Sequence, residues 1–155
     1  MSFVIAGIDP APCRHLFGLS EDALAERQVV RMVADAKPGF PCRVTLADAD
    51  PGETVLLVNY EHQPLDTPYR SRHAIFVREW AIAIGRFVNV VPESLALRLL
   101  SVRAFDAAGM MTDADVIDGT DLEALISAFS RIRRWPICMS TMRGAAASRH
   151  GSIGL

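Results

Sequence analysis

Residues 54–60, TVLLVNY, do most to decide the fold of this chain, because their run of aliphatic and β-branched side chains is typical of a buried strand. Residues 50–53, DPGE, come just before them and predict a turn that closes a hairpin with a candidate strand over residues 42–46. After a polar loop, residues 73–78, HAIFVR, predict a neighbouring strand. Strands are therefore expected to dominate the middle of the chain.

Outward from this region, the patterns predict helices and strands in mixed order. Further strands are expected over residues 2–8, 80–91, 102–106 and 110–116, the last two joined as a hairpin. Helices are expected over residues 21–30, 93–100 and 121–129, with start signals at Ser20, Pro92 and the pair Thr120 and Glu123. This order predicts an α+β fold with a mixed, largely antiparallel sheet and two to three flanking helices.

The composition indicates one globular domain, which we assign to residues 1–130. Half of the 155 residues are hydrophobic and 22% are charged. No apolar run approaches the ~18 residues that cross a bilayer, and the N-terminal stretch lacks the basic start of a signal peptide. We therefore expect a cytoplasmic protein with no membrane partner. The three cysteines are widely spaced, with no C-x-x-C pair, so no metal site is predicted.

The charge of the chain changes sharply near its end. Residues 1–130 hold all 18 acidic residues, whereas residues 131–155 hold five of the 16 basic ones and no acid. A basic tail can bind nucleic acid, but this one has no lysine and is not dense in charge. No nucleic-acid partner is therefore expected.

The polar segment between the two strongest strands holds the best candidates for function, because loops on rigid strands commonly carry sites. His62 and His73 are candidate general bases, since histidine titrates near neutral pH. Arginine side chains give paired donors to carboxylate or phosphate, so a small anionic ligand is expected here. The candidate ligand-binding residues are Arg43, Tyr60, Tyr69, Arg70, Arg72 and Arg103. A solvated loop without function is the alternative interpretation.

Cys42 is a third catalytic candidate. Arg43 follows it, and a neighbouring guanidinium can lower the pKa of a thiol and make it a nucleophile. The alternative is that Cys42, at the start of a strand, is a small buried hydrophobic residue.

Three segments together resemble a bacterial family catalogued as domain of unknown function 1203. They are IDPAPCRHLFGLSEDAL, the run from residue 33 to residue 79, and LLSVRAFDAAGMMTDADVIDG. The resemblance covers about residues 2–126. It implies a small cytoplasmic α+β domain and no particular reaction or cofactor.

The C-terminal residues depart from this family. Members that resemble the chain end in an aromatic strand of the type A-Y-L-H-V-H-N-A, followed by G-C-[FY]-A-A-R, and residues 131–155 show neither. Codons for these residues permit such a strand in a shifted reading frame. We therefore expect a frameshift near residues 127–130, which leaves residues 131–155 as an aberrant, poorly packed or disordered tail. A genuinely divergent C-terminus is the alternative.

Two functions remain open at this point. The chain is either a small enzyme or anionic-ligand-binding domain that uses the His/Arg/Tyr loop, or a non-catalytic interaction or structural module. Convergence of His62, Arg70, His73 and Cys42 in one place would favour the first. The substrate, any cofactor and the oligomeric state stay unknown from the sequence.

Overall fold

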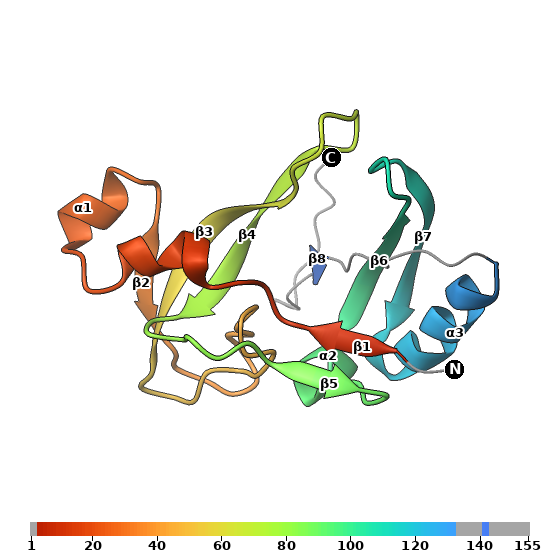
Figure 1. Ribbon diagram of the computed structural model, residues 1–155. Helices are drawn as coiled ribbons and strands as arrows, with labels where there is room; N and C mark the ends of the chain where they lie inside the picture. The colour runs from red at the N-terminus through yellow and green to blue at the C-terminus, as the bar shows by residue number, and fades with distance from the viewer. Residues whose placement is uncertain (1–2, 133–140, 143–155) are drawn as a thin grey trace, which may run out of the picture.

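The computed structural model describes residues 3–132 and 141–142, and Figure 1 shows how they are arranged. Its strands are β1 Val4–Ala6, β2 Val30–Val33, β3 Thr54–Gln63, β4 Ser71–Arg78, β5 Arg86–Val88, β6 Leu99–Phe105, β7 Met111–Asp118 and β8 Thr141–Met142. Its helices are α1 Glu21–Ala25, α2 Glu93–Ala96 and α3 Leu122–Ile132, with 3-10 turns at Ala11–Leu16 and Gly119–Asp121.

The described strands form three small antiparallel sheets, with the orders β2-β3-β4, β7-β6-β8 and β1-β5. Figure 1 shows the first two side by side, with the β1-β5 pair and α2 running below them. The predicted α+β class with largely antiparallel pairing is confirmed. The last predicted hairpin is confirmed as β6–β7, and the last predicted helix as α3.

Two larger hydrophobic cores, with a smaller third one around Ala34, Ala49 and Val55, hold these sheets in place. One face of β3 and β4 buries Leu56, Val58 and Val77 against Leu24 of α1 and against Val44. Burying a side chain of this kind contributes about 1.5–3 kcal/mol. The second core packs β6 on α2 and α3, through Leu95, Leu100, Val102, Leu122 and Ile126. The amphipathic pattern of α3 therefore serves to cover β6.

The prediction of one helix over residues 21–30 is wrong at its end. Helix α1 begins after the predicted cap Ser20, whose hydroxyl accepts a hydrogen bond from the N–H of Ala23. It stops at Ala25, and Gln28 adopts a φ of 57°, which a right-handed helix does not allow. The chain then enters β2, where Val30 and Val33 are both exposed. Without an apolar alternation, this strand left no signal in the sequence.

The prediction of a strand over residues 42–46 is also wrong. The N–H of Leu46 donates to the carbonyl of Cys42 at 3.0 Å, and Leu46 has a φ of 55°, so the chain closes into a tight loop. The turn at residues 50–53 is confirmed by the hydrogen bond from the N–H of Glu53 to the carbonyl of Asp50. The turn leads into β3 as predicted, but β3 pairs with β2 and β4 and not with residues 42–46.

Two further boundaries differ from prediction. Of residues 80–91, only those of β5 form a strand. Trp80 adopts a φ of 69°, which interrupts an extended chain. Gly85 lies against the loop at Thr45, where the Cβ of any other residue would come within 2.0 Å of a carbonyl oxygen. The predicted helix over residues 93–100 ends at Ala96, and β6 begins at Leu99. The alternate burial of Leu100 and Val102 explains why this segment is a strand.

The predicted tail, residues 131–155, lies almost wholly outside the described residues. Within residues 3–132 and 141–142, no helix is long and apolar enough to cross a membrane.

Candidate functional site

The β3–β4 hairpin places its polar residues where its hydrophobic core ends. Val58 lies opposite Ile75, and two positions further along Tyr60 lies opposite His73. Side chains alternate between the two faces of a strand, so Tyr60 and His73 share the face that buries Val58. The cluster around His73 is therefore a polar continuation of the core.

A β-bulge positions His62. The register of the hairpin shifts between Glu61 and Gln63, so that His62 is the extra residue on β3. Gln63 thereby takes the position opposite Ser71, two residues before His73 on β4. Such bulges redirect side chains and are frequent beside functional sites.

The two histidines and Ser71 form a continuous chain of contacts. Nδ1 of His62 lies 3.1 Å from Nδ1 of His73, and the ring centroids are 4.5 Å apart. Nε2 of His62 lies 3.0 Å from Oγ of Ser71. All three side chains are half-buried. His62 is thus held at both ring nitrogens.

The surroundings of the pair favour neutral imidazoles. Burial lowers the pKa of His62 below its ordinary value, and the neighbouring His73 and Arg103 lower it further. Burial also lowers the pKa of His73, with Arg103 and Arg43 adding to the effect. Because a neutral imidazole carries one donor and one acceptor, one histidine donates to the other across the Nδ1–Nδ1 contact.

Arg43 and Arg103 supply positive charge to this site from two different parts of the fold. Arg103 lies on β6, and Arg43 follows the tight loop residue Cys42 and pairs through its N–H with the carbonyl of Phe76 on β4. Burial, together with the nearby Arg98, lowers the pKa of Arg43 to about 10, so it stays charged at neutral pH. Within the described part of the chain, neither guanidinium makes a hydrogen bond or ion pair.

The other predicted arginines lie elsewhere. Glu61 lies opposite Arg72 on the strand position between Tyr60 and His62, which faces away from Tyr60 and His73. Its carboxylate accepts from Nε of Arg70 at 2.8 Å and from Nε of Arg72 at 3.5 Å. These bonds, that of Arg70 foremost, lower the pKa of Glu61. Arg70 and Arg72 therefore form an exposed ion-pair cluster.

The side chains of Cys42 and Tyr69 make packing contacts inside the fold. Cys42 is 1% exposed and its Sγ accepts a hydrogen bond from the N–H of Arg78 at 3.3 Å. Tyr69 packs edge-on against Phe105, with centroids 6.4 Å apart. His62, His73, Arg43 and Arg103 therefore lie near one another, and Tyr60 shares the face of the hairpin that carries His73. Arg70 and Arg72 pair with Glu61 on the opposite face, and Cys42 is buried beside Arg43.

The tips of the two long hairpins are tied together above this cluster. Nε2 of Gln63 and Oγ1 of Thr67 both donate to the carbonyl of Gly109 in the β6–β7 turn, at 3.1 and 3.2 Å. Gly109 has a φ of +80°, and a Cβ there would come within 2.7 Å of Leu65. This contact fixes Arg103 relative to the histidines, because it joins the hairpins that carry them. Sequence reasoning missed both Gln63 and Ser71.

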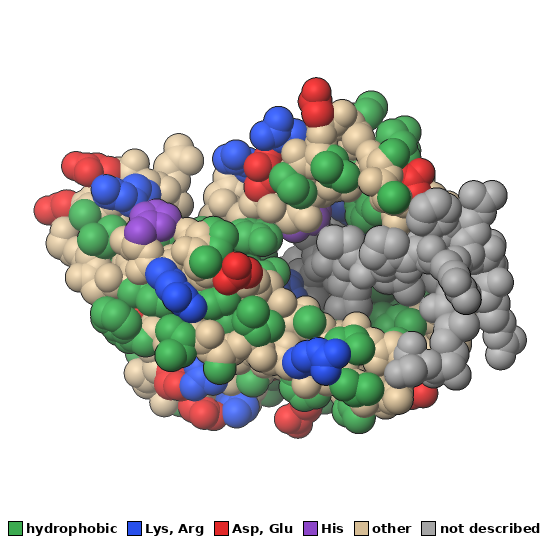
Figure 2. All heavy atoms as spheres, viewed as in Figure 1, with side chains coloured by type: hydrophobic (Ala, Val, Ile, Leu, Met, Phe, Trp, Pro, Cys, Tyr) green, Lys and Arg blue, Asp and Glu red, His purple; other side chains and the backbone are tan. Residues whose placement is uncertain are grey.

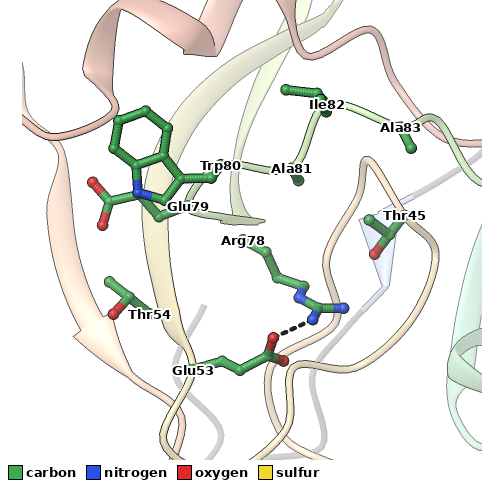
Figure 3. A pocket seen from close by; sticks show the side chains of 9 residues that line it. All are labelled: Thr45, Glu53, Thr54, Arg78, Glu79, Trp80, Ala81, Ile82 and Ala83. Atoms are coloured by element: carbon green, nitrogen blue, oxygen red, sulfur yellow. Dashed lines mark hydrogen bonds and ion pairs between the residues drawn. The ribbon is translucent and has the colours of Figure 1, made fainter.

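A separate cavity of about 470 Å³ lies beside the end of β4. Figure 3 shows Arg78 and Glu53 pointing toward each other across it, in an ion pair, with Trp80 at its side. Oγ1 of Thr45 is buried there without a partner among the described residues. Since Arg78 is already paired with Glu53 and Glu79 adds a second carboxylate to the lining, this cavity offers an anion much less than Arg43 and Arg103 do.

Figure 2 shows histidine and basic side chains at the surface near the middle of this face, below the hairpin tips.

These features define an α+β domain in which the histidines of one hairpin lie near an arginine of the other hairpin and near Arg43 of the segment before β3. The chain belongs to the family described as protein of unknown function (DUF1203), which matches residues 39–135. That range includes Arg43, the β3–β4 hairpin and Arg103. The family resemblance seen in the sequence is thus confirmed. Searches of curated proteins and of solved structures each returned no match.

Proposed function

We propose that this protein binds a small anionic ligand between Arg43 and Arg103, beside His62 and His73. The observation that carries the proposal is that two half-buried guanidinium groups lie near a histidine pair and make no hydrogen bond or ion pair among the described residues, although the Asp48 carboxylate offsets part of the charge of Arg43. Unpaired charge in such a place is costly unless a partner arrives. A carboxylate or phosphate is the partner that arginine suits best.

The histidines add to this preference. An anion bound beside them stabilises their protonated forms, so binding is expected to take up protons below neutral pH. Each charge-assisted hydrogen bond contributes about 1.5–3 kcal/mol. We take the protein to act in the cytoplasm without a membrane or nucleic-acid partner.

Thermal unfolding with succinate or inorganic phosphate, at constant ionic strength, tests the proposal. Both anions should raise the unfolding temperature, because a ligand of the native state stabilises it. Arg103→Met should lose most of this rise. Arg72→Met removes the same charge from the opposite face and is the matched control. No rise in the wild type, or equal losses in the two variants, would refute the proposal.

The alternative, a non-catalytic interaction or structural module, makes a different prediction. In that case neither anion stabilises the protein, and Arg103→Met leaves the unfolding temperature unchanged in every buffer. The same measurements therefore separate the two functions.

We also propose that residues 1–130 form the working domain and that residues 131–155 come from a shifted reading frame. The support is the sequence resemblance and the change in charge at that point. The coding DNA tests it: the alternative frame must encode the histidine-bearing strand found in relatives.

A further inference from the structure

We propose that Ser71 is a nucleophile, activated by His62 and positioned through His73, that hydrolyses small esters bearing a carboxylate. The inference rests on the proposed anion site, since Arg43 and Arg103 would hold that carboxylate. It assigns Ser71 and His62 as catalytic residues and His73 as a positioning residue.

The geometry supplies the contacts that such a mechanism needs. Oγ of Ser71 is 3.0 Å from Nε2 of His62, within reach for transfer of the hydroxyl proton. On the other side of the ring, Nδ1 of His62 is 3.1 Å from Nδ1 of His73. When His62 donates from Nδ1, its Nε2 presents a lone pair to Ser71. His73 then fixes the tautomer of the base, as an orienting residue must.

Backbone structure holds these groups in place. Ser71 and His73 lie two positions apart on β4 and therefore face the same side. The bulge at His62 brings its ring to both of them. Within the described residues, the Ser71 hydroxyl makes no other hydrogen bond. A merely structural serine would not need a base that is itself oriented by a second histidine.

The chemistry is a two-step acyl transfer without redox change. Oγ of Ser71 forms a bond to the ester carbonyl carbon while its proton moves to Nε2 of His62. The bond from that carbon to the alcohol oxygen breaks, and the alcohol leaves with this proton. His62 then takes a proton from water, whose oxygen bonds to the acyl carbon. The bond to Oγ breaks, and the proton returns to Ser71.

The 4-nitrophenyl monoester of succinate tests this assignment, with 4-nitrophenyl acetate as the uncharged control. We expect faster release of nitrophenolate from the succinate ester, and a succinyl group on Ser71 in mass spectra of early time points. Ser71→Ala and His62→Gln should each lower the rate by about 10²- to 10⁴-fold. Arg72→Met should leave the rate unchanged.

A conservative variant separates positioning from simple structural support at His73. In His73→Phe the rate should fall, because Nδ1–H of His62 loses the acceptor that fixes its tautomer. His73→Asn keeps an acceptor near that position and should restore much of the rate. Equal rates in the two variants would contradict the role given to His73.

The two proposals fail in different ways. If succinate stabilises both the wild type and Ser71→Ala but no acyl group forms on Ser71, the nucleophile assignment is wrong and the anion site stands. An acyl group on another residue has the same consequence. If succinate does not stabilise the wild type, both proposals fall together.

Discussion

Arg98 and Arg43 lie close enough for the charge of Arg98 to lower the pKa of Arg43, yet their surroundings are opposite. Arg98 is buried with Asp48 and donates to both of its carboxylate oxygens, at 2.9 and 2.5 Å. It also donates to the carbonyl of Ser94. Arg43 is half-buried and has no such partner in the described part of the chain.

The difference separates two uses of the same residue type. Asp48 lies in the long segment between β2 and β3, and Arg98 follows α2, so their pairing ties this segment to the end of α2. Asp48 also accepts from the N–H of Gly39, so both of its carboxylate oxygens are engaged. We call Arg98 and Asp48 a closed pair, because each charge is neutralised within the protein, and such a pair stabilises the fold. We call Arg43 an open arginine, because its guanidinium makes no hydrogen bond or ion pair among the described residues and is available to a ligand.

Breaking the closed pair should give the largest effect. Arg98→Met leaves the Asp48 carboxylate buried and unpaired, so the free energy of unfolding should fall by about 3–5 kcal/mol. Denaturant unfolding measures this. Asp50→Asn, which breaks the exposed pair with Lys37, is the control and should change stability little. If the free energy of unfolding fell by a similar amount in both variants, the buried pair would be no more important for stability than an exposed one.

Changing the open arginine should affect binding rather than folding. Arg43→Met removes no hydrogen bond to a described side chain, so stability without ligand should be retained or should rise. Affinity for succinate should fall by about 10- to 100-fold, as expected for the loss of one charge-assisted bond of about 1.5–3 kcal/mol. Titration calorimetry measures the affinity. A loss of stability as large as in Arg98→Met would show that Arg43 is structural.

The sequence predicted the candidate ligand site better than it predicted the Asp48–Arg98 ion pair. The histidines and Arg43 were candidates because residue type and position pointed to them, and β3 and β4 were found from their apolar pattern. The Asp48–Arg98 pair was not predicted, because its members are 50 residues apart and meet only in the folded chain.

Local geometry explains why the sequence did not predict the loop after Cys42 or the roles of Gln63 and Ser71. The tight loop after Cys42 depends on a positive φ at Leu46, a residue type that gives no signal for it. The role of Gln63 depends on the bulge at His62, and a bulge is set by pairing across the hairpin. Ser71 was missed because the predicted strand began at His73 and left Ser71 in the polar loop, whereas β4 begins at Ser71 and so places Ser71 and His73 on one face.

The open site should also respond to acid. The pKa values of His62 and His73 lie below the ordinary value, so below about pH 6.5 the unfolded chain binds protons that the folded chain does not. Stability should therefore fall as the pH drops, with a slope of at most about 1.4 kcal/mol per pH unit for each histidine. The double variant His62→Gln/His73→Gln should flatten this part of the stability curve, and succinate should do so in the wild type. An unchanged slope in the double variant would place the acid response elsewhere.

The smallest effect is expected on the far side of the same hairpin. Arg70 pairs with Glu61 at the surface and is 53% exposed, so solvent already weakens the interaction. In Arg70→Met the pKa of Glu61 should rise toward its ordinary value, because its main hydrogen-bond donor is lost. Carbon-detected NMR titration of the Glu61 carboxylate measures this shift. The unfolding temperature and the affinity for succinate should both stay close to those of the wild type, since alternation along β3 directs Glu61 away from the face of Tyr60 and His73. If Arg70→Met instead weakened succinate binding as much as Arg43→Met, the ligand would have to contact both faces of the hairpin, and open charge would no longer identify the site.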